Sequence, residues 1–184
     1  MRELSLHVLD ALENSVEAGA TSIELVIEER LKADTLEIVI RDNGRGMSPE
    51  FVRQVLNPFV TTRKTRHVGL GLPLFAAAAR RCNGDLRVES EAGVGTTISA
   101  TFQHSHIDRA PVGDMAGSVM AILLSDRPVD IRYRHTVDDR QFELDTAEVR
   151  KELGTVPLSH PDVRGWLQSV LTEGLADLRP PGLL

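Results

Sequence analysis

The chain lacks the features that disulfide-rich secreted proteins, membrane proteins and nucleic-acid-binding proteins need. Its one cysteine, Cys82, cannot form an intramolecular disulfide bond, and no apolar run reaches the length of a membrane span. The first residues, Met1 to His7, are too polar for a signal peptide. Lys and Arg number 21 against 27 Asp and Glu, and the net charge of -6 disfavours a surface that grips nucleic acid or anionic lipid. We therefore expect a cytoplasmic protein that binds neither nucleic acid nor membranes.

The chain divides into two parts by the character of its sequence. Its 184 residues are enough for one good-sized domain, or for one domain with an appendage. After His104 a stretch to Asp114, with Pro111 and Gly113, is typical of a linker. The sequence thus predicts a main domain over residues 1–105 and a C-terminal accessory region over residues 106–184, whose role no motif reveals.

Hydrophobic periodicity predicts a mixture of helices and strands in both parts. The first part should contain a helix over 4–18, strands around 23–27 and 36–40, a short helix over 48–56, a loop over 59–68, a helix over 70–82, and a hairpin of strands 85–91 and 96–103. The second part should contain strands over 119–125, 129–135 and 141–145, with a hairpin turn at 137–140, and helices over 147–153 and 161–178.

A polar stripe runs along the first expected helix. At about 100° per residue, five polar side chains fall within roughly an 80° arc: Glu3, His7, Asp10, Asn14 and Glu17. A solvated helix face explains this stripe about as well as a binding site does. The amide oxygen of Asn14 suits magnesium, which keeps waters and takes its other oxygens from substrate phosphates. One turn earlier, the carboxylate of Asp10 could orient or deprotonate an attacking water, so Asp10 is the candidate base.

A second string, Asp42-Asn43-Gly44-Arg45-Gly46-Met47, follows directly after an expected strand. Such residues are common in plain turns, and that reading stays open. The alternative is a ligand site, since a carboxylate at Asp42 would accept from the exocyclic amine of adenine and repel the carbonyl of guanine. Met47 would then lie against the ring, although by itself a methionine here is more often a core residue.

A third string, Gly69-Leu70-Gly71-Leu72, opens an expected helix. Glycines there expose backbone N–H groups, and the helix dipole favours an anion, so the string predicts a phosphate cradle. Three basic side chains precede it, Arg63, Lys64 and Arg66, and they serve either the phosphates or a solvated charge cluster.

Together the strings resemble the motifs of the GHKL superfamily, the ATP-binding domains of sensor histidine kinases, anti-sigma serine kinases, gyrase, mismatch-repair ATPases and heat-shock chaperones. The resemblance covers about residues 1–103. It implies these roles: Asn14 for the magnesium ion, Asp42 for adenine, Gly44 and Gly46 for the first glycine box with Met47 beside it, Gly69 to Leu72 for the end of the nucleotide lid with Lys64 before it, and Thr96 for support of adenine through water.

The resemblance also implies an α+β fold of the Bergerat type. This is a two-layer α/β sandwich in which helices cover one face of a mixed sheet, here with a small β-hairpin and helical C-terminal extension.

Departures from the superfamily pattern bear on the activity. Hydrolytic members carry glutamate where this chain has Asp10. Because the motif helix begins at the amino terminus, we expect no upstream phospho-accepting histidine domain. No lysine after residue 105 matches the one that gyrase relatives bring to ATP. We expect Mg-ATP binding, with phosphoryl transfer to a separate, unidentified protein or slow hydrolysis. The alternative is a non-catalytic, nucleotide-switched module that grips a protein partner, as an anti-sigma regulator does. Homodimerisation stays open.

Overall fold

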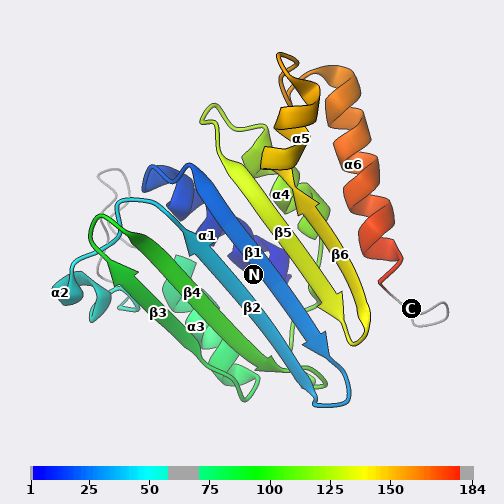
Figure 1. The fold of residues 1–184 in the computed structure, drawn as a ribbon. Coiled ribbons are helices and arrows are strands. Elements are labelled where there is room, and N and C mark those ends of the chain that lie inside the picture. The colour runs from blue at the N-terminus through cyan, green and yellow to red at the C-terminus, as the bar shows by residue number, and fades with distance from the viewer. Residues whose placement is uncertain (1, 58–70, 179–184) are drawn as a thin grey trace.

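A computed structural model describes residues 2–57 and 71–178, which form a six-stranded sheet with helices packed on it (Figure 1). The strands are β1 Ser22–Arg30, β2 Thr35–Asp42, β3 Leu86–Glu91, β4 Gly95–Gln103, β5 Asp130–Val137 and β6 Arg140–Asp145. The helices are α1 Leu4–Glu17, α2 Pro49–Val52, α3 Gly71–Arg81, α4 Met115–Leu123, α5 Thr146–Leu153 and α6 Pro161–Ala176. None of the helices in these described residues is long and apolar enough to cross a membrane.

The sheet is mixed, in the order β3-β4-β2-β1-β5-β6. All neighbours are antiparallel except β1 and β5, which run parallel. Alternating apolar residues of β1 and β2 are buried, and α1, α3 and α4 lie on that side of the sheet (Figure 1). The opposite side carries ion pairs such as Arg41 with Glu24 at 2.6 Å. The expected α+β, two-layer architecture is therefore confirmed.

Most of the expected helices and strands are present, with ends that differ by a few residues. The short helix expected over 48–56 is reduced to the single turn α2, in which Ser48 accepts from the N–H of Phe51 and Pro49 occupies the first helical position. The turn between β5 and β6 contains Asp138 at φ 47°, a conformation that aspartate tolerates better than most residues. The loop expected over 59–68 lies outside the described residues.

The strand expected over 119–125 is wrong, because residues 119–123 belong to helix α4 and the next two residues follow its end. Asp114 caps the helix by accepting a 2.8 Å hydrogen bond from the N–H of Gly117. The helix is apolar nearly all round and packs against α1, β5 and α6. A short run of this kind has no readable period, so the apolar content alone could not separate a buried helix from a buried strand.

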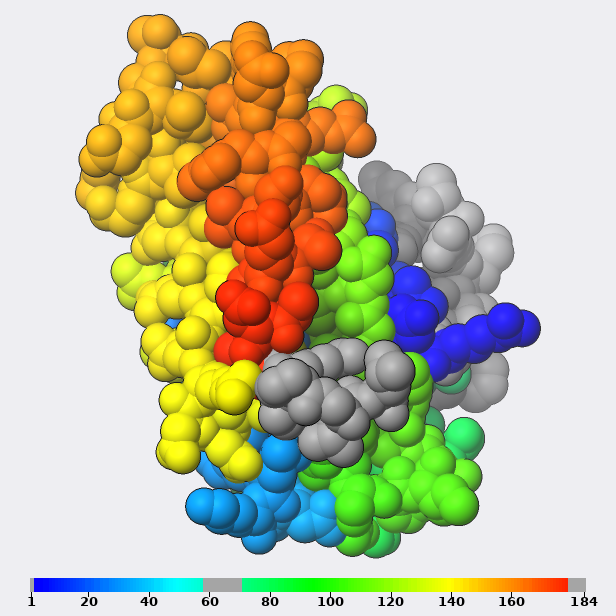
Figure 2. Space-filling model, turned by 90° about the vertical axis from the view of Figure 1, so that its right-hand side faces the viewer, coloured from blue at the N-terminus to red at the C-terminus, as the bar shows by residue number. Residues whose placement is uncertain are grey.

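Residues after 106 continue the same sheet and core. Strand β5 pairs with β1 from Ser22 opposite Asp130 to Glu29 opposite Val137. The segment expected as a linker is fastened to α1, since the N–H groups of Leu4 and Ser5 donate to the carbonyls of Pro111 and Val112 at 2.9 and 2.8 Å. Figure 2 shows α4 between α6 and the amino-terminal part of α1, in agreement with the contacts among these helices.

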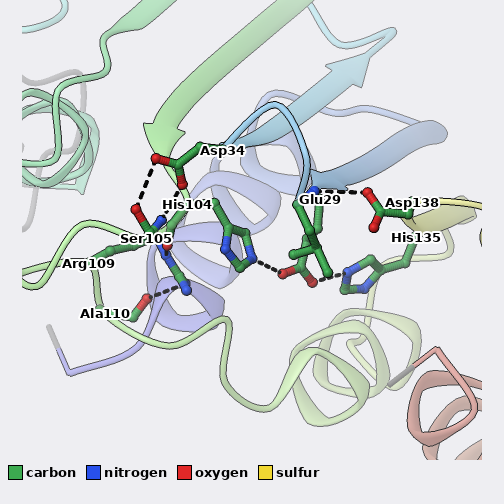
Figure 3. A network of polar contacts seen from close by, with 9 residues as sticks. Glu29, Asp34, His104, Ser105, Arg109, Ala110, His135 and Asp138 are labelled. Atoms are coloured by element: carbon green, nitrogen blue, oxygen red, sulfur yellow. Dashed lines mark hydrogen bonds and ion pairs between the residues drawn. The ribbon is translucent and has the colours of Figure 1, made fainter. Parts of the chain in front are cut away.

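A polar cluster links the two parts of the chain beside the sheet. The carboxylate of Glu29 lies between His104 and His135, with Nε2 distances of 2.8 and 2.9 Å (Figure 3). The hydroxyl of Tyr133 lies 3.0 Å from Nδ1 of His135. Burial alone would raise the pKa of Glu29, but hydrogen bonds with His135 and His104 outweigh it and lower the pKa to about 2.

Candidate functional site

The ends of several elements meet at one edge of the sheet. Asp42 is the last residue of β2, and it stands opposite Ile23 of β1 and Thr96 of β4. The last turn of α1 lies beside this corner, because Ser15 hydrogen-bonds Asp42. This arrangement brings Asp42 and Thr96, which are 54 positions apart in the printed sequence, to neighbouring places on the helix-covered side of the sheet.

The Asp42 carboxylate is held from two directions. Its Oδ1 accepts a 2.8 Å hydrogen bond from the N–H of Gly44, and its Oδ2 accepts a 2.8 Å hydrogen bond from the hydroxyl of Ser15. Each carboxylate oxygen has two lone pairs, so each can accept one more hydrogen bond. The side chain is half-buried. Asp42 is thus held in one orientation and can still accept hydrogen bonds from a ligand. An aspartate that only stabilises a turn needs neither property.

Ser15 is a site residue that sequence reasoning missed. Its side chain is 2 % exposed, and its hydroxyl also lies 3.3 Å from the carbonyl of Ala11. A buried serine in a helix usually bonds back to its own helix, and only the spatial approach of β2 gives it a second partner. The one signal in the sequence is its place next to Asn14.

Ser90 of β3 is the second residue that sequence reasoning missed. Its hydroxyl lies 2.9 Å from Oγ1 of Thr96 and 2.8 Å from the carbonyl of Gly95, and it accepts a 2.9 Å hydrogen bond from the N–H of Met47. The hydroxyl therefore joins Thr96 to the loop after Asp42. The Met47 side chain is half-buried.

Gly44 and Gly46, in the loop after Asp42, lie where neighbouring atoms leave no space for a side chain. Gly46 has φ 63°, and a Cβ there would lie 1.9 Å from the carbonyl oxygen of Glu91. A Cβ at Gly44 would lie 2.9 Å from the Cβ of Ala18. The loop is clamped on both sides, since the N–H of Arg45 donates to Ala18 and its carbonyl accepts from Gly93, at 3.0 and 2.8 Å.

Gly71 opens α3 directly over the polar stripe of α1. A Cβ at Gly71 would lie 3.6 Å from the Cβ and Oδ2 of Asp10 and 3.9 Å from Nδ2 of Asn14, which are ordinary contacts. Packing alone therefore does not require glycine at this position. The next residue, Leu72, is half-buried. Lys64, Gly69 and Leu70 lie outside the described residues, as do Arg63 and Arg66.

His7 shows that the stripe is more than a solvated face. The ring is 4 % exposed and stacks on Phe75 of α3, with centroids 5.0 Å apart and planes 9° apart. Its Nδ1 has no hydrogen-bond partner among the residues that the structure describes. Burial lowers the pKa of His7 to about 4, so the ring is neutral at pH 7. Asp10 and Asn14, by contrast, remain partly accessible.

Comparison with known proteins gives a consistent result. A family model described as "Histidine kinase-, DNA gyrase B-, and HSP90-like ATPase" matches residues 2–106. Sporulation kinase C of Bacillus subtilis (strain 168) is 33% identical over 94 residues, which are 51% of this chain and 22% of that protein. Sensor kinase CckA of Brucella abortus (strain 2308) is 24% identical over 160 residues, covering 74% of this chain and 17% of the relative. The chain thus spans about a fifth of these relatives' length.

A solved structure described as the N-terminal domain of a DNA repair protein shares the fold. It matches with a TM-score of 0.51 and 14% sequence identity, over 79% of this chain and 53% of the other. This likeness concerns the arrangement of the backbone alone.

Proposed function

The chain belongs to the histidine kinase-, DNA gyrase B- and HSP90-like ATPase family, and on that premise we propose that it binds Mg-ATP and passes the terminal phosphoryl group to a separate protein, or slowly to water. Domains of this family bind ATP. The named relatives are kinases, which favours transfer to a protein as the main activity.

The observation that carries the proposal is the corner formed by Asp42, Ser15 and Thr96. A carboxylate held by Ser15 and the Gly44 N–H, with capacity to spare, suits the exocyclic amine of adenine. Thr96 stands beside it on β4, where a hydroxyl can hold a bridging water. The carbonyl of guanine is an acceptor and would be repelled by the same carboxylate, so ATP should bind more tightly than GTP.

The other half of the proposed site is the contact between α1 and α3. No group of three or more His, Cys, Asp or Glu in residues 2–57 and 71–178 is arranged to hold a metal ion alone. Asn14 would therefore share magnesium with the phosphates, the mode that this ion prefers, and the ion would neutralise phosphate charge. Packing does not require glycine at position 71, so the missing side chain leaves space above the first turn of α3. An anion could approach the backbone N–H groups through this space. Asp10, on the same face, is the candidate base.

Calorimetry with Asp42→Asn tests the nucleotide assignment. The amide side chain of this variant can still accept from the N–H of Gly44 through its oxygen and donate to the Ser15 hydroxyl through its nitrogen, so the fold should persist. One of the two oxygens that could accept from adenine is thereby replaced by an NH2 group, which can only donate. Loss of a hydrogen bond to a charged group costs about 1.5 to 3 kcal/mol, which is roughly 10- to 150-fold in ATP affinity. Asp85→Asn is the matched control, because Asp85 is exposed and its carboxylate bonds Arg80 and the backbone of Leu86. Equal ATP affinity of Asp42→Asn and wild type would refute the assignment.

Labelled ATP decides between transfer and a binding-only module. Asp10→Asn should keep ATP affinity and lose transfer or hydrolysis by about 10²- to 10⁴-fold, the usual cost of a missing general base. Asn14→Ala should lose the magnesium-dependent part of the affinity. If Asp10→Asn matches wild type and no labelled phosphate moves to protein or water in either, the nucleotide-switched module is the correct function.

A further inference from the structure

The last turn of α1 carries three consecutive groups that bear on the proposed site. Asn14 faces Gly71, Ser15 holds Asp42, and the carbonyl of Val16 accepts a 3.0 Å hydrogen bond from Nη1 of Arg127. We propose that Arg127 is a positioning residue of the nucleotide site, through which the C-terminal region sets ATP affinity without contacting ATP. This proposal rests on the proposed function.

The fold delivers Arg127 to this place. It lies in the connection between α4 and β5, three residues before β5 begins. Because β5 runs parallel to β1, the start of β5 lies beside the start of β1, with Ser22 opposite Asp130. The N–H of Asp130 also donates to the carbonyl of Thr21 at 3.0 Å. The connection therefore ends at the carboxyl end of α1, next to the strand that follows it.

A guanidinium at this helix end has a clear physical basis. The last carbonyls of a helix have no partner within the helix and carry the negative end of its dipole. Here the carbonyl of Val16 accepts from the N–H of Gly19, just past the helix, and also from Arg127, each at 3.0 Å. The adjacent carbonyl of Glu17 accepts from Arg45 at 3.2 Å, so two arginines from different parts of the chain add charged donors to this helix end. Arg45 belongs to the loop that follows Asp42. One helical turn is thus held between the nucleotide loop and the C-terminal region.

Release of Arg127 should loosen both halves of the proposed site together. Asn14 and Ser15 lie in the turn that Arg127 holds, so fraying of this turn moves the proposed metal ligand and the partner of Asp42 at once. Linkage requires the reverse effect as well: ATP that orders this turn also strengthens the Arg127 contact. A purely structural cap would lower overall stability and leave the ATP affinity of the folded protein unchanged.

The experiment compares Arg127→Ala, Arg127→Lys and the control Arg132→Ala in the full chain. Arg132 lies on β5 and pairs with Asp145 of β6 at 3.0 Å. The first readout is calorimetry with ATP and Mg. Arg127→Ala should bind ATP at least fivefold more weakly than wild type, a coupling of ordinary size. Arg127→Lys should restore most of the affinity, and Arg132→Ala should match wild type.

The second readout is amide hydrogen exchange without nucleotide. The N–H groups of Ala18, Gly19 and Ala20 donate to the carbonyls of Asn14, Val16 and Ser15, so they report on this turn directly. In Arg127→Ala they should exchange at least fivefold faster, with no such change in Arg132→Ala. Unchanged exchange at these amides, or unchanged ATP affinity of a folded Arg127→Ala in a wild type that binds ATP, would overturn the proposal. Absence of ATP binding by wild type would instead refute the proposed function, and the exchange data would still test whether Arg127 holds α1.

Discussion

His7 is buried, and its Nδ1 has no partner in residues 2–57 and 71–178, which should make stability depend on pH. Its folded pKa is about 4 against an ordinary value of 6.5. Between these values the unfolded chain binds a proton that the folded chain does not, so the unfolding free energy should fall as pH falls from 6.5 to 4 and then level off. The full effect is at most about 3 kcal/mol. Urea unfolding at pH 7.5, 5.5 and 4.5 measures it.

His7→Phe separates this contribution from the rest of the protein. Phenylalanine can keep the stack on Phe75 and has no nitrogen to satisfy, so the variant should lose the pH dependence in this window and be at least as stable at pH 7. His160→Gln is the control, since His160 is exposed at the start of α6. A pH dependence in His7→Phe as steep as in wild type would contradict the assignment.

The β3–β4 hairpin determines the shape of the loop after Asp42, and its glycines test that contact. Gly95 has φ 145°, and a Cβ there would lie 1.9 Å from the carbonyl oxygen of Asp42, whereas Gly93 has φ 81° with nothing within 4 Å. Gly93→Ala should lower the free energy of unfolding by about 1–2 kcal/mol, the cost of placing a side chain in the left-handed conformation. Gly95→Ala should cost at least about 2 kcal/mol more, because main chain must move. Denaturant unfolding of both variants checks this difference, and equal losses would show that the loop adapts freely.

The elements differ in how far the sequence reveals them. Strands β1 and β2 alternate except at Val26 and Val39, and α1 has a clear polar stripe, so their type and their motifs could be predicted. Helix α4 could not, because it is apolar on nearly every side. The parallel pairing of β5 with β1 could not either, since nothing local encodes a partner strand more than 100 residues away. Ser15, Ser90 and Arg127 escaped prediction for the same reason: their partners come from other elements.

At the scale of the molecule, Glu29 connects the two parts of the chain and should set acid stability. Its pKa is about 2 when folded against an ordinary 4.5, so its contribution is complete above pH 4.5 and is lost as pH falls through 2. This window overlaps that of His7 only between pH 4.5 and 4. Glu29→Gln should cost about 3 kcal/mol at pH 7, because a neutral amide cannot replace the charged acceptor that lies between His104 and His135. It should also flatten the acid-induced loss between pH 4.5 and 2.

The control for Glu29→Gln is Glu24→Gln, which breaks a pair on the open face of the sheet. The Arg41 side chain of that pair is 54% exposed, so the loss should stay below about 1 kcal/mol. Chemical unfolding at pH 7, 4 and 2.5 distinguishes the two. Equal losses would mean that the contacts with His104 and His135 contribute no more than a surface ion pair.

A chain ending at Ser105 tests whether the C-terminal region is an accessory or part of the fold. The proposed ATP residues in the described structure, Asp10, Asn14, Asp42, Gly71 and Thr96, all precede this point. Removal of the rest would nevertheless expose the edge of β1, take α4 from α1 and remove His135 from Glu29. We expect the fragment to melt far below the full chain.

Mg-ATP should then rescue part of the lost stability of the shortened chain. A ligand at 100 times its dissociation constant stabilises by about 2.7 kcal/mol, and this rise should be smaller in the fragment because Arg127 no longer holds the last turn of α1. Thermal unfolding with and without Mg-ATP measures both effects. A fragment as stable as the full chain would establish residues 106–184 as a separate appendage. A folded fragment that ATP does not stabilise would show that the C-terminal region completes the site. Residues after 105 would then be needed for ATP binding itself and not only for the stability of the shared sheet.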